Sequence, residues 1–441
     1  MTQAEFDHPS VADEPESRPG GIPLFVWVIG AAALAVPVGL LVPRVVGGVD
    51  LPTQLDLMPN LIIRAIKALA TPLVVFAILS AIVTNDVRGR QGGRMMFYYL
   101  VNTIVAIAIG LAFSNLVRPG VGAKLAETAP APVAAAPAAP GAKAELQGIT
   151  KLLYEMVPES IADSFVRNHL AQLVVVTLAL GIGLAKIRDE QRLRGETSHQ
   201  VVIDLITVVF ELLMRVLLWL VVLVPLAVFG VVAANIMRSG LDVFKSLLWF
   251  IAVVLGGLAC QVTWYLVQLG VFARMSPVRF LKGAANVMAT AFSTSSTGAT
   301  MPVTLRALTG PLGVSRQSSQ LAACVGTNFN NDGTALYQAA VVLFIAQDLG
   351  RDLAAMDQVV ICLTTVVASI GAGCIPSGSF VTLPLIFAAV ALPVEQITFL
   401  LTIDWFLDRC RTTSNVLGDM TVAVLLDRTA TVEPGPLPAV G

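Results

Sequence analysis

Long apolar stretches separated by short polar segments dominate the first half of this chain. Helices are expected over residues 23–42, 61–83, 95–117, 170–187, 201–236 and 243–273. A helix needs about 20 apolar residues to cross the hydrocarbon core of a bilayer. The pattern therefore predicts a series of membrane-spanning helices joined by loops in which the charged residues gather.

The second half, from about residue 277, differs because small and polar residues interrupt its apolar segments. The interruptions are FSTSSTGATMP (292–302), GTNFNNDGTALY (326–337) and ASIGAGCIPSGS (368–379). Broken backbone cannot face lipid, since unpaired polar groups are costly there. The first and third interruptions predict re-entrant hairpins on either side of a broken helix, which is typical of inverted-repeat transporters.

Composition supports a lipid environment and excludes some functions. Charged residues, 28 basic and 29 acidic, make up 13% of the 441 residues, whereas a soluble domain usually carries about 25%. The net charge of −1 argues against the strongly basic surface of a nucleic-acid-binding protein. No HExxH or GxSxG motif occurs, so a membrane-embedded hydrolase is not favoured. The five cysteines form no CxxC pair, and no disulfide framework is expected.

The loops and tails predict an orientation. Basic residues cluster in alternate loops, around residues 88–94, 186–194 and 274–282. By the positive-inside rule these loops lie in the cytoplasm, together with an N-terminal tail (1–21) and a C-terminal tail (428–441). The Ala/Pro-rich segment 118–148 is expected to be a flexible extracellular loop that carries no chemistry.

The last helix carries a polar stripe. The stripe consists of Asp404, Asp408, Arg411, Asn415 and Asp419. The last four lie 4, 7, 11 and 15 residues after the first. At about 100° per residue they fall within roughly 80° of the helix surface. A charge at the bilayer centre costs about 3 kcal/mol, so the stripe must face a polar interior. Three acids against one Arg leave negative charge that a cation can neutralise, although a self-neutralising ion-pair cluster is the alternative.

Two chemistries follow from these residues. Arg411 offers a planar fork for a carboxylate and Asp408 can hold an ammonium group, which together describe a site for an acidic amino acid. Direct pairing of Arg411 with Asp408 is the other interpretation. In NNDGT (330–334), Asn330 and Asp332 supply hard oxygen ligands suited to sodium, or else a hydrogen-bonded kink without an ion.

In the segments 404–419 and 330–347, and over about residues 22–427, the chain resembles the dicarboxylate/amino acid:cation symporter family, which includes excitatory amino acid transporters and archaeal aspartate transporters. The resemblance implies an all-α homotrimer in the cell membrane, with eight transmembrane helices and two re-entrant hairpins. In such a protein a transport core moves as an elevator against a static scaffold. The scaffold would be residues 22–94 and 149–236, and the core 95–117 and 237–427.

The resemblance also implies site residues at matching positions. The acidic amino acid would be held by Ser296, Thr297, Thr334, Ile375, Ser379, Asp408, Arg411, Thr412 and Asn415. Co-transported sodium would be held by side chains or carbonyls of Tyr99, Asn102, Thr103, Gly326, Asn328, Asn330, Asp332, Ser369, Ile370, Ala372, Asn415 and Asp419.

Several positions depart from the family pattern. Asn331 replaces a usual Met, Asn328 and Asn102 replace Thr, and Cys374 and Ser379 stand where glycines are common. The tip of the first expected hairpin also reads Ser-Ser-Thr-Gly (295–298) instead of a serine run.

The expectation is a sodium-coupled importer of L-aspartate or L-glutamate, and not an enzyme. Proton coupling, a neutral amino-acid or C4-dicarboxylate substrate, and an anion channel are the alternatives.

Overall fold

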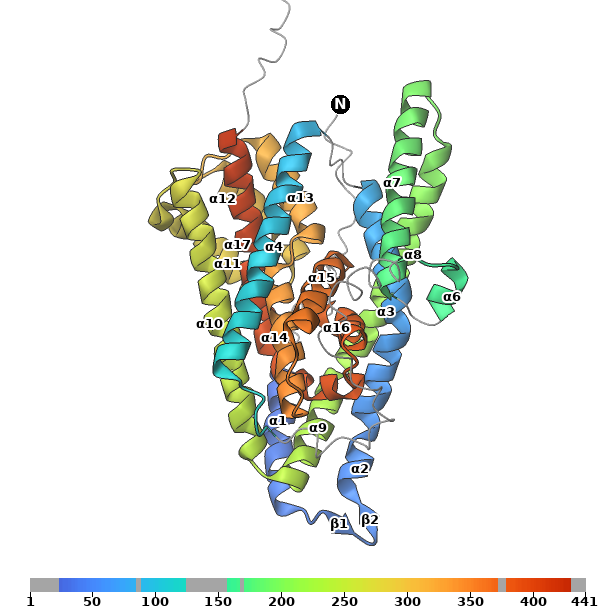
Figure 1. The fold of residues 1–441 in the computed structure, drawn as a ribbon, viewed down its shortest axis with the longest axis vertical. Helices are drawn as coiled ribbons and strands as arrows, with labels where there is room; N and C mark the ends of the chain where they lie inside the picture. Colours follow the sequence, from blue (N-terminus) through green and yellow to red (C-terminus); the bar gives the residue numbers. More distant parts are fainter. Residues whose placement is uncertain (1–23, 85–88, 124–156, 167–169, 372–377, 430–441) are drawn as a thin grey trace, which may run out of the picture.

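The computed structural model describes residues 24–84, 89–123, 157–166, 170–371 and 378–429, and these are almost entirely helical (Figure 1). The expected tail 1–21 and residues 124–148 of the expected loop lie outside the described residues. The expected C-terminal tail begins inside the last helix, which runs to Thr429. One small antiparallel pair of strands, β1 (Val45–Val46) and β2 (Val49–Asp50), joins the first two helical segments.

The helices of the first half follow the apolar stretches. They are α1 (Leu24–Leu41), α2 (Leu51–Leu55), α3 (Leu57–Thr84), α4 (Gly89–Val117), α6 (Ile161–Val166), α7 (Leu170–Arg194), α8 (Ser198–Val222), α9 (Val224–Ser239) and α10 (Asp242–Val271). The stretch 201–236 is thus two helices that meet at Leu223. Pro225, in the first turn of α9, explains the break, because it has no N–H to continue the hydrogen bonds of α8.

The second half contains shorter helices in pairs. They are α11 (Pro277–Thr294), α12 (Thr297–Thr309), α13 (Arg316–Phe329), α14 (Asp332–Asp348), α15 (Ala355–Gly371) and α16 (Gly378–Ala389), followed by the 3₁₀ helix η4 (Val394–Leu400) and α17 (Leu401–Thr429). The predicted interruptions fall between paired helices. Ser295 ends α11 with a left-handed φ of 53°, and the Ser296 side chain caps α12 by accepting from the backbone N–H of Ala299.

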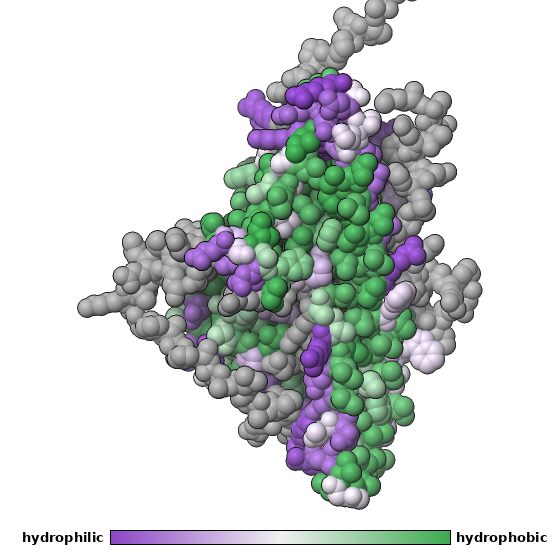
Figure 2. All heavy atoms as spheres, turned by 90° about the vertical axis from the view of Figure 1, so that its right-hand side faces the viewer, coloured by the Kyte–Doolittle hydropathy of each residue, from purple (hydrophilic) through white to green (hydrophobic). Residues whose placement is uncertain are grey.

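The described surface carries a broad apolar area. Figure 2 shows hydrophobic side chains over the middle of one face and hydrophilic ones gathered toward its ends. On α8, exposed apolar residues recur with helical spacing at Val201, Leu205, Val208 and Leu212. Such a face suits lipid. The described ends of α3, α7 and α10 and the start of α4, next to the basic loops, lie toward the upper end in Figure 1.

Within the described segments, three helices are long and apolar enough to span a membrane: Arg90–Val117, Ser198–Val222 and Phe244–Val271. The bent pair Leu51–Ile66 and Thr71–Val83 meets the same criteria when its two parts are counted as one span, which gives four. Other apolar helices, α1, α9, α15 and α16 among them, are shorter than one bilayer crossing or broken. The expectation of eight spans therefore stays a prediction.

Helix α14 forms the centre of the fold. Every residue from Asp332 to Gln347 is buried, and α4, α10, α15 and α17 pack around it. Glycines let α4 approach closely, because a Cβ on Gly110 would lie 2.5 Å from the carbonyl oxygen of Leu336. Small residues at crossings allow this contact in membrane proteins.

Gly110→Ala is expected to lower the stability of the purified protein by about 1–3 kcal/mol, because the new methyl group overlaps the α14 backbone. Gly93→Ala in the same helix is the matched control. Gly93 is exposed, and among the described residues no atom outside its own stretch of helix lies within 4 Å of the place that an alanine methyl group would take, so this change should stabilise the helix by about 0.5–1 kcal/mol. Thermal unfolding in detergent measures both, and equal effects would contradict the close-packed crossing.

Candidate functional site

The polar residues of the second half meet where the break between α13 and α14 lies against the middle of α17. Asn330 is extended, with φ −103° and ψ 97°, and ends α13, whereas Asp332 begins α14. The backbone N–H of Gly333 donates to Asn415 Oδ1 at 2.8 Å. A Cβ on Gly333 would lie 2.8 Å from the carbonyl oxygen of Arg411, so glycine lets the first turn of α14 rest on α17. The break thus exposes backbone and side-chain oxygens inside the protein.

Asp332 lies at the contact of three helices. Its carboxylate accepts from the Thr103 hydroxyl of α4 at 2.8 Å and from the Tyr265 hydroxyl of α10 at 2.7 Å. Its exposed fraction is 0%. Each oxygen therefore accepts from one of the two hydroxyls, and because a carboxylate offers about four lone pairs, it can also bind a cation.

Asp419, on α17, lies next to the same break. Asn330 Nδ2 donates to Asp419 Oδ1 at 2.8 Å and to the carbonyl oxygen of Asn415 at 3.0 Å. Asn330 Oδ1 is buried and has no hydrogen-bond partner within the described part of the chain. A buried amide oxygen without a donor is suited to binding a small hard cation.

Gly326 in α13 lies against both the Asp419 carboxylate and the Tyr99 hydroxyl. A Cβ at this position would overlap the Asp419 carboxylate and would lie 2.6 Å from the Tyr99 hydroxyl. The Tyr99 hydroxyl in turn donates to the carbonyl oxygen of Ala322 at 2.8 Å. Glycine at 326 therefore allows α4, α13 and α17 to converge.

The charge around this break is unbalanced. Asp332 and Asp419 are both nearly or completely buried. Among the described residues, no Lys, Arg or His nitrogen lies within 4.0 Å of either carboxylate. An isolated buried carboxylate is costly, and a bound cation removes most of that cost. We call Asp332, Asp419, Asn330 and Thr103 the carboxylate pair site.

Arg411 lies on α17 about one helical turn before Asn415 and is completely buried. Its Nη2 donates to Asp404 Oδ1 at 2.8 Å and to Asp408 Oδ1 at 2.7 Å. Its Cζ atom stands 4.0 Å from the ring centroid of Tyr337, an arrangement that favours a cation. Arg411 Nε and Nη1 are buried and have no partner in the segments that the structure describes. The guanidinium therefore pairs with two acids through one nitrogen and keeps further donors for an anionic ligand.

Comparison with known proteins decides the family. A model described as the sodium:dicarboxylate symporter family matches residues 24–429. The chain belongs to this family. The symporter resemblance found in residues 404–419 and 330–347 is thereby confirmed. Members are transporters rather than enzymes, so the protein carries small molecules across a membrane.

Three similar proteins illustrate the range of the family. Excitatory amino acid transporter 3 of Mus musculus is 27% identical, over 89% of this chain and 83% of the relative. Neutral amino acid transporter B(0) of Bos taurus is 30% identical, over 83% and 72%. The C4-dicarboxylate transport protein of Rhizobium leguminosarum bv. trifolii is 28% identical, over 97% and 93%. Similarity therefore extends to relatives named for different substrates.

The residues expected at the two interruptions 292–302 and 368–379 are only partly placed. Thr297 is buried at the start of α12, and Ser379 is buried in α16, where its hydroxyl has no partner among the described residues. Asn331 Nδ2 donates to the carbonyl oxygen of Ser369 at 3.0 Å, which ties the break to α15. Ala372 and Ile375 lie outside the described residues, as does the side chain of Ile370.

The remaining expected residues lie near the break. Asn415 Nδ2 is 3.4 Å from Thr334 Oγ1, and Thr412 is buried in α17 next to Arg411. Asn328 occupies the last turn of α13. Asn102 differs from the others, because its side-chain oxygen accepts from residues of α10 instead of facing Asp332.

Sequence reasoning misses three residues that contact the candidate site. It places Asp404 on the stripe but not among the ligand residues, although Asp404 shares Arg411 with Asp408. It does not single out Tyr265 or Tyr337. A signal exists, because only five Tyr occur in the chain and a Tyr inside a membrane helix needs a partner for its hydroxyl.

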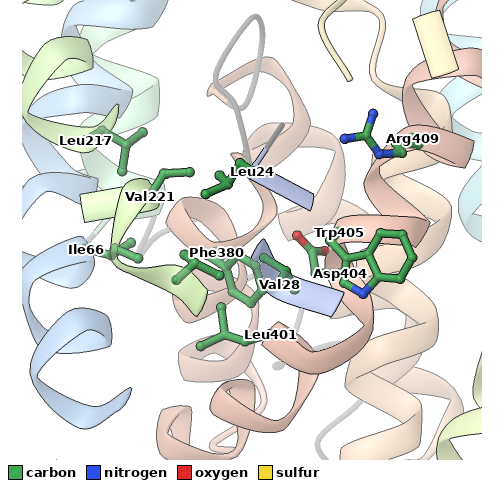
Figure 3. Close-up of a pocket in the computed structure, with 11 residues that line it drawn as sticks. Leu24, Val28, Ile66, Leu217, Val221, Phe380, Leu401, Asp404, Trp405 and Arg409 are labelled. Atoms are coloured by element: carbon green, nitrogen blue, oxygen red, sulfur yellow. The ribbon is translucent and has the colours of Figure 1, made fainter. Parts of the chain in front are cut away.

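A cavity of about 60 Å³ lies next to Asp404 (Figure 3). It is lined by Leu24, Val28, Ile66, Leu217, Val221, Val224, Phe380, Leu401, Asp404, Trp405 and Arg409. These residues come from α1, α3, α8 and α9 on one side and from α16 and α17 on the other. Ligand pockets usually measure about 300–1,000 Å³. The cavity is therefore too small for an amino acid and marks an apolar contact between the two groups of helices.

Proposed function

We propose that this symporter imports L-aspartate or L-glutamate together with sodium ions. The observation that carries the substrate class is Arg411, which is fully buried between two carboxylates and keeps two donor nitrogens without a partner among the described residues. A substrate side-chain carboxylate would accept from these donors, and its ammonium group would bind Asp408. The mouse relative named as an excitatory amino acid transporter agrees with this substrate class.

The carboxylate pair site supports cation coupling. Asp332 and Asp419 contribute two buried negative charges, and Asn330 Oδ1 adds an amide oxygen. Moving one positive charge inward gains about 2.3 kcal/mol per 100 mV, whereas an anionic substrate alone moves against the field. Coupling to more than one sodium ion would therefore make import favourable.

The transport cycle is proposed on the same basis. The core helices would move as an elevator against the scaffold helices α1, α3, α7, α8 and α9, and the cavity of Figure 3 lies at this contact. We also propose that the protein crosses the membrane eight times, assembles as a homotrimer and has both termini in the cytoplasm. The described helix ends beside the basic loops lie toward one end of the molecule (Figure 1), which supports the orientation.

Uptake of labelled aspartate by proteoliposomes tests the function. An inward sodium gradient is expected to drive accumulation, and a potential that is negative inside should increase it, because net positive charge enters. Uptake that ignores sodium but follows a proton gradient would favour the proton-coupled alternative. Uptake of labelled succinate but not of labelled aspartate would point to a C4-dicarboxylate, and flux without saturation would point to a channel.

A further inference from the structure

A second polar cluster lies between α4 and α10, beside the carboxylate pair site. We call Asn102, Gln261, Trp264 and Gln268 the amide cluster. Asn102 Oδ1 accepts from Trp264 Nε1 at 3.0 Å and from Gln268 Nε2 at 2.5 Å, while Gln261 Nε2 approaches the carbonyl oxygen of Asn102 at 3.3 Å. Exposed fractions are 0% for Asn102 and Gln261 and 3% for Gln268.

The Asn102 side chain has no lone pair left for a cation. A carboxamide oxygen has two lone pairs, and Trp264 and Gln268 each donate to this one. Its other terminal atom, Nδ2, is a donor and repels a cation. A cation could bind Oδ1 only by breaking one of the buried bonds, which leaves a buried donor unpaired.

The amide cluster lies directly beside the groups that bind Asp332. On α4, Thr103 follows Asn102, and its hydroxyl donates to one Asp332 oxygen. On α10, Tyr265 follows Trp264, and its hydroxyl donates to the other oxygen. The bonds of Asn102 therefore hold α4 and α10 together at the level where both helices present a hydroxyl to the same carboxylate.

We propose that Asn102 is a positioning residue for the cation at Asp332, and that its carboxamide joins α4 to α10 instead of binding the ion. The amide cluster sets the separation of the Thr103 and Tyr265 hydroxyls, and through them the direction of the Asp332 carboxylate. This role rests on the proposed function in one respect, namely that a sodium ion binds at Asp332.

The test compares variants that remove the bonds of Asn102 from either side. Asn102→Leu, Gln268→Leu and Trp264→Phe are each expected to raise the sodium concentration for half-maximal thermal stabilisation of the purified, substrate-free protein about tenfold. Tenfold corresponds to about 1.4 kcal/mol. The KM for aspartate at saturating sodium should change less than twofold. Because all three variants act on one cluster, Asn102→Leu combined with Gln268→Leu should be little worse than either alone.

Thr263→Val is the matched control. Thr263 is exposed on α10, next to Trp264, and within the described part of the chain its hydroxyl bonds only to the carbonyl oxygen of Ala259 in its own helix. Its sodium response should equal that of the unchanged protein. Trp264→Phe keeps an aromatic ring and removes a single bond, so the test does not depend on the folding of Asn102→Leu.

Two outcomes overturn the proposal, and they are distinguishable. If Gln268→Leu and Trp264→Phe retain the original sodium dependence while Asn102→Leu loses it, Asn102 binds the ion directly and is not a positioning residue. If the unchanged protein shows no sodium response at all, the proposed sodium coupling fails, and the positioning role fails with it.

Discussion

Arg411→Cys is expected to reduce the affinity for aspartate at least 100-fold. Two charge-assisted hydrogen bonds to the substrate carboxylate contribute about 1.5–3 kcal/mol each, and their loss corresponds to more than two decades in affinity. Asp408, one helical turn before position 411, remains and can still hold an ammonium group. Sodium-dependent uptake of serine or alanine is therefore expected to persist or to appear. Uptake of labelled aspartate and serine in proteoliposomes measures both changes.

Arg428→Cys is the matched control, because Arg428 lies on the same helix but is exposed near its end. It should leave aspartate uptake unchanged. Removing Arg411 also leaves Asp404 and Asp408 without their buried partner, which can cost about 3–5 kcal/mol of stability. The double variant Arg411→Cys with Asp404→Asn removes one of these charges and keeps the experiment interpretable. Aspartate affinity within twofold of the original in a folded variant would refute the carboxylate assignment.

Asp332→Asn is expected to stabilise the protein in the absence of sodium and to abolish the stabilisation that sodium produces. Asp332 is fully buried, and no basic nitrogen within the described segments lies within 4.0 Å of its carboxylate, so a neutral amide of the same shape avoids a desolvated charge. In the unchanged protein, sodium at 100 times its dissociation constant should add about 2.7 kcal/mol. Thermal unfolding in sodium chloride and in choline chloride gives both quantities.

Asp419→Asn should behave in the same way, because Asp419 is the other member of the pair. Asp352→Asn is the control, since the Asp352 side chain is 87% exposed and its pair with Arg118 is a surface ion pair. It should keep the full sodium response. A normal sodium response in both Asp332→Asn and Asp419→Asn would show that the cation binds elsewhere.

The predictable parts of the site are those with a local pattern. Asp408, Arg411 and Asn415 share a helix face because their spacing follows the helical repeat, and on α17 Arg411 and Asn415 are buried whereas Asp408 is partly buried. The break at residues 330–331 is likewise predictable from the sequence, because polar residues and glycine interrupt an apolar run. Local rules of this kind depend only on neighbours along the chain.

The partners of these residues are not predictable. Spacing along one helix pairs Arg411 with Asp408, but it does not reveal that the same nitrogen also reaches Asp404. Asn102 looks equivalent to a sodium ligand in the sequence, yet its oxygen is occupied by donors from α10. Residue type indicates which bonds a side chain can make, and packing determines which of them form.

By itself, the sequence determined that this protein lies in a membrane, that its last helices carry buried charge, and that it resembles one family of symporters. A chain with so few charged residues and such long apolar stretches cannot form a water-exposed surface over most of its length, so these conclusions follow from the sequence. Only the tertiary structure decided how the charges are paired. It left Asp332 and Asp419 without a basic partner in the described chain, and it brought Tyr265 to Asp332 from another helix. The physical reason is that hydrogen bonds between helices depend on how remote segments pack, and no local pattern records that arrangement.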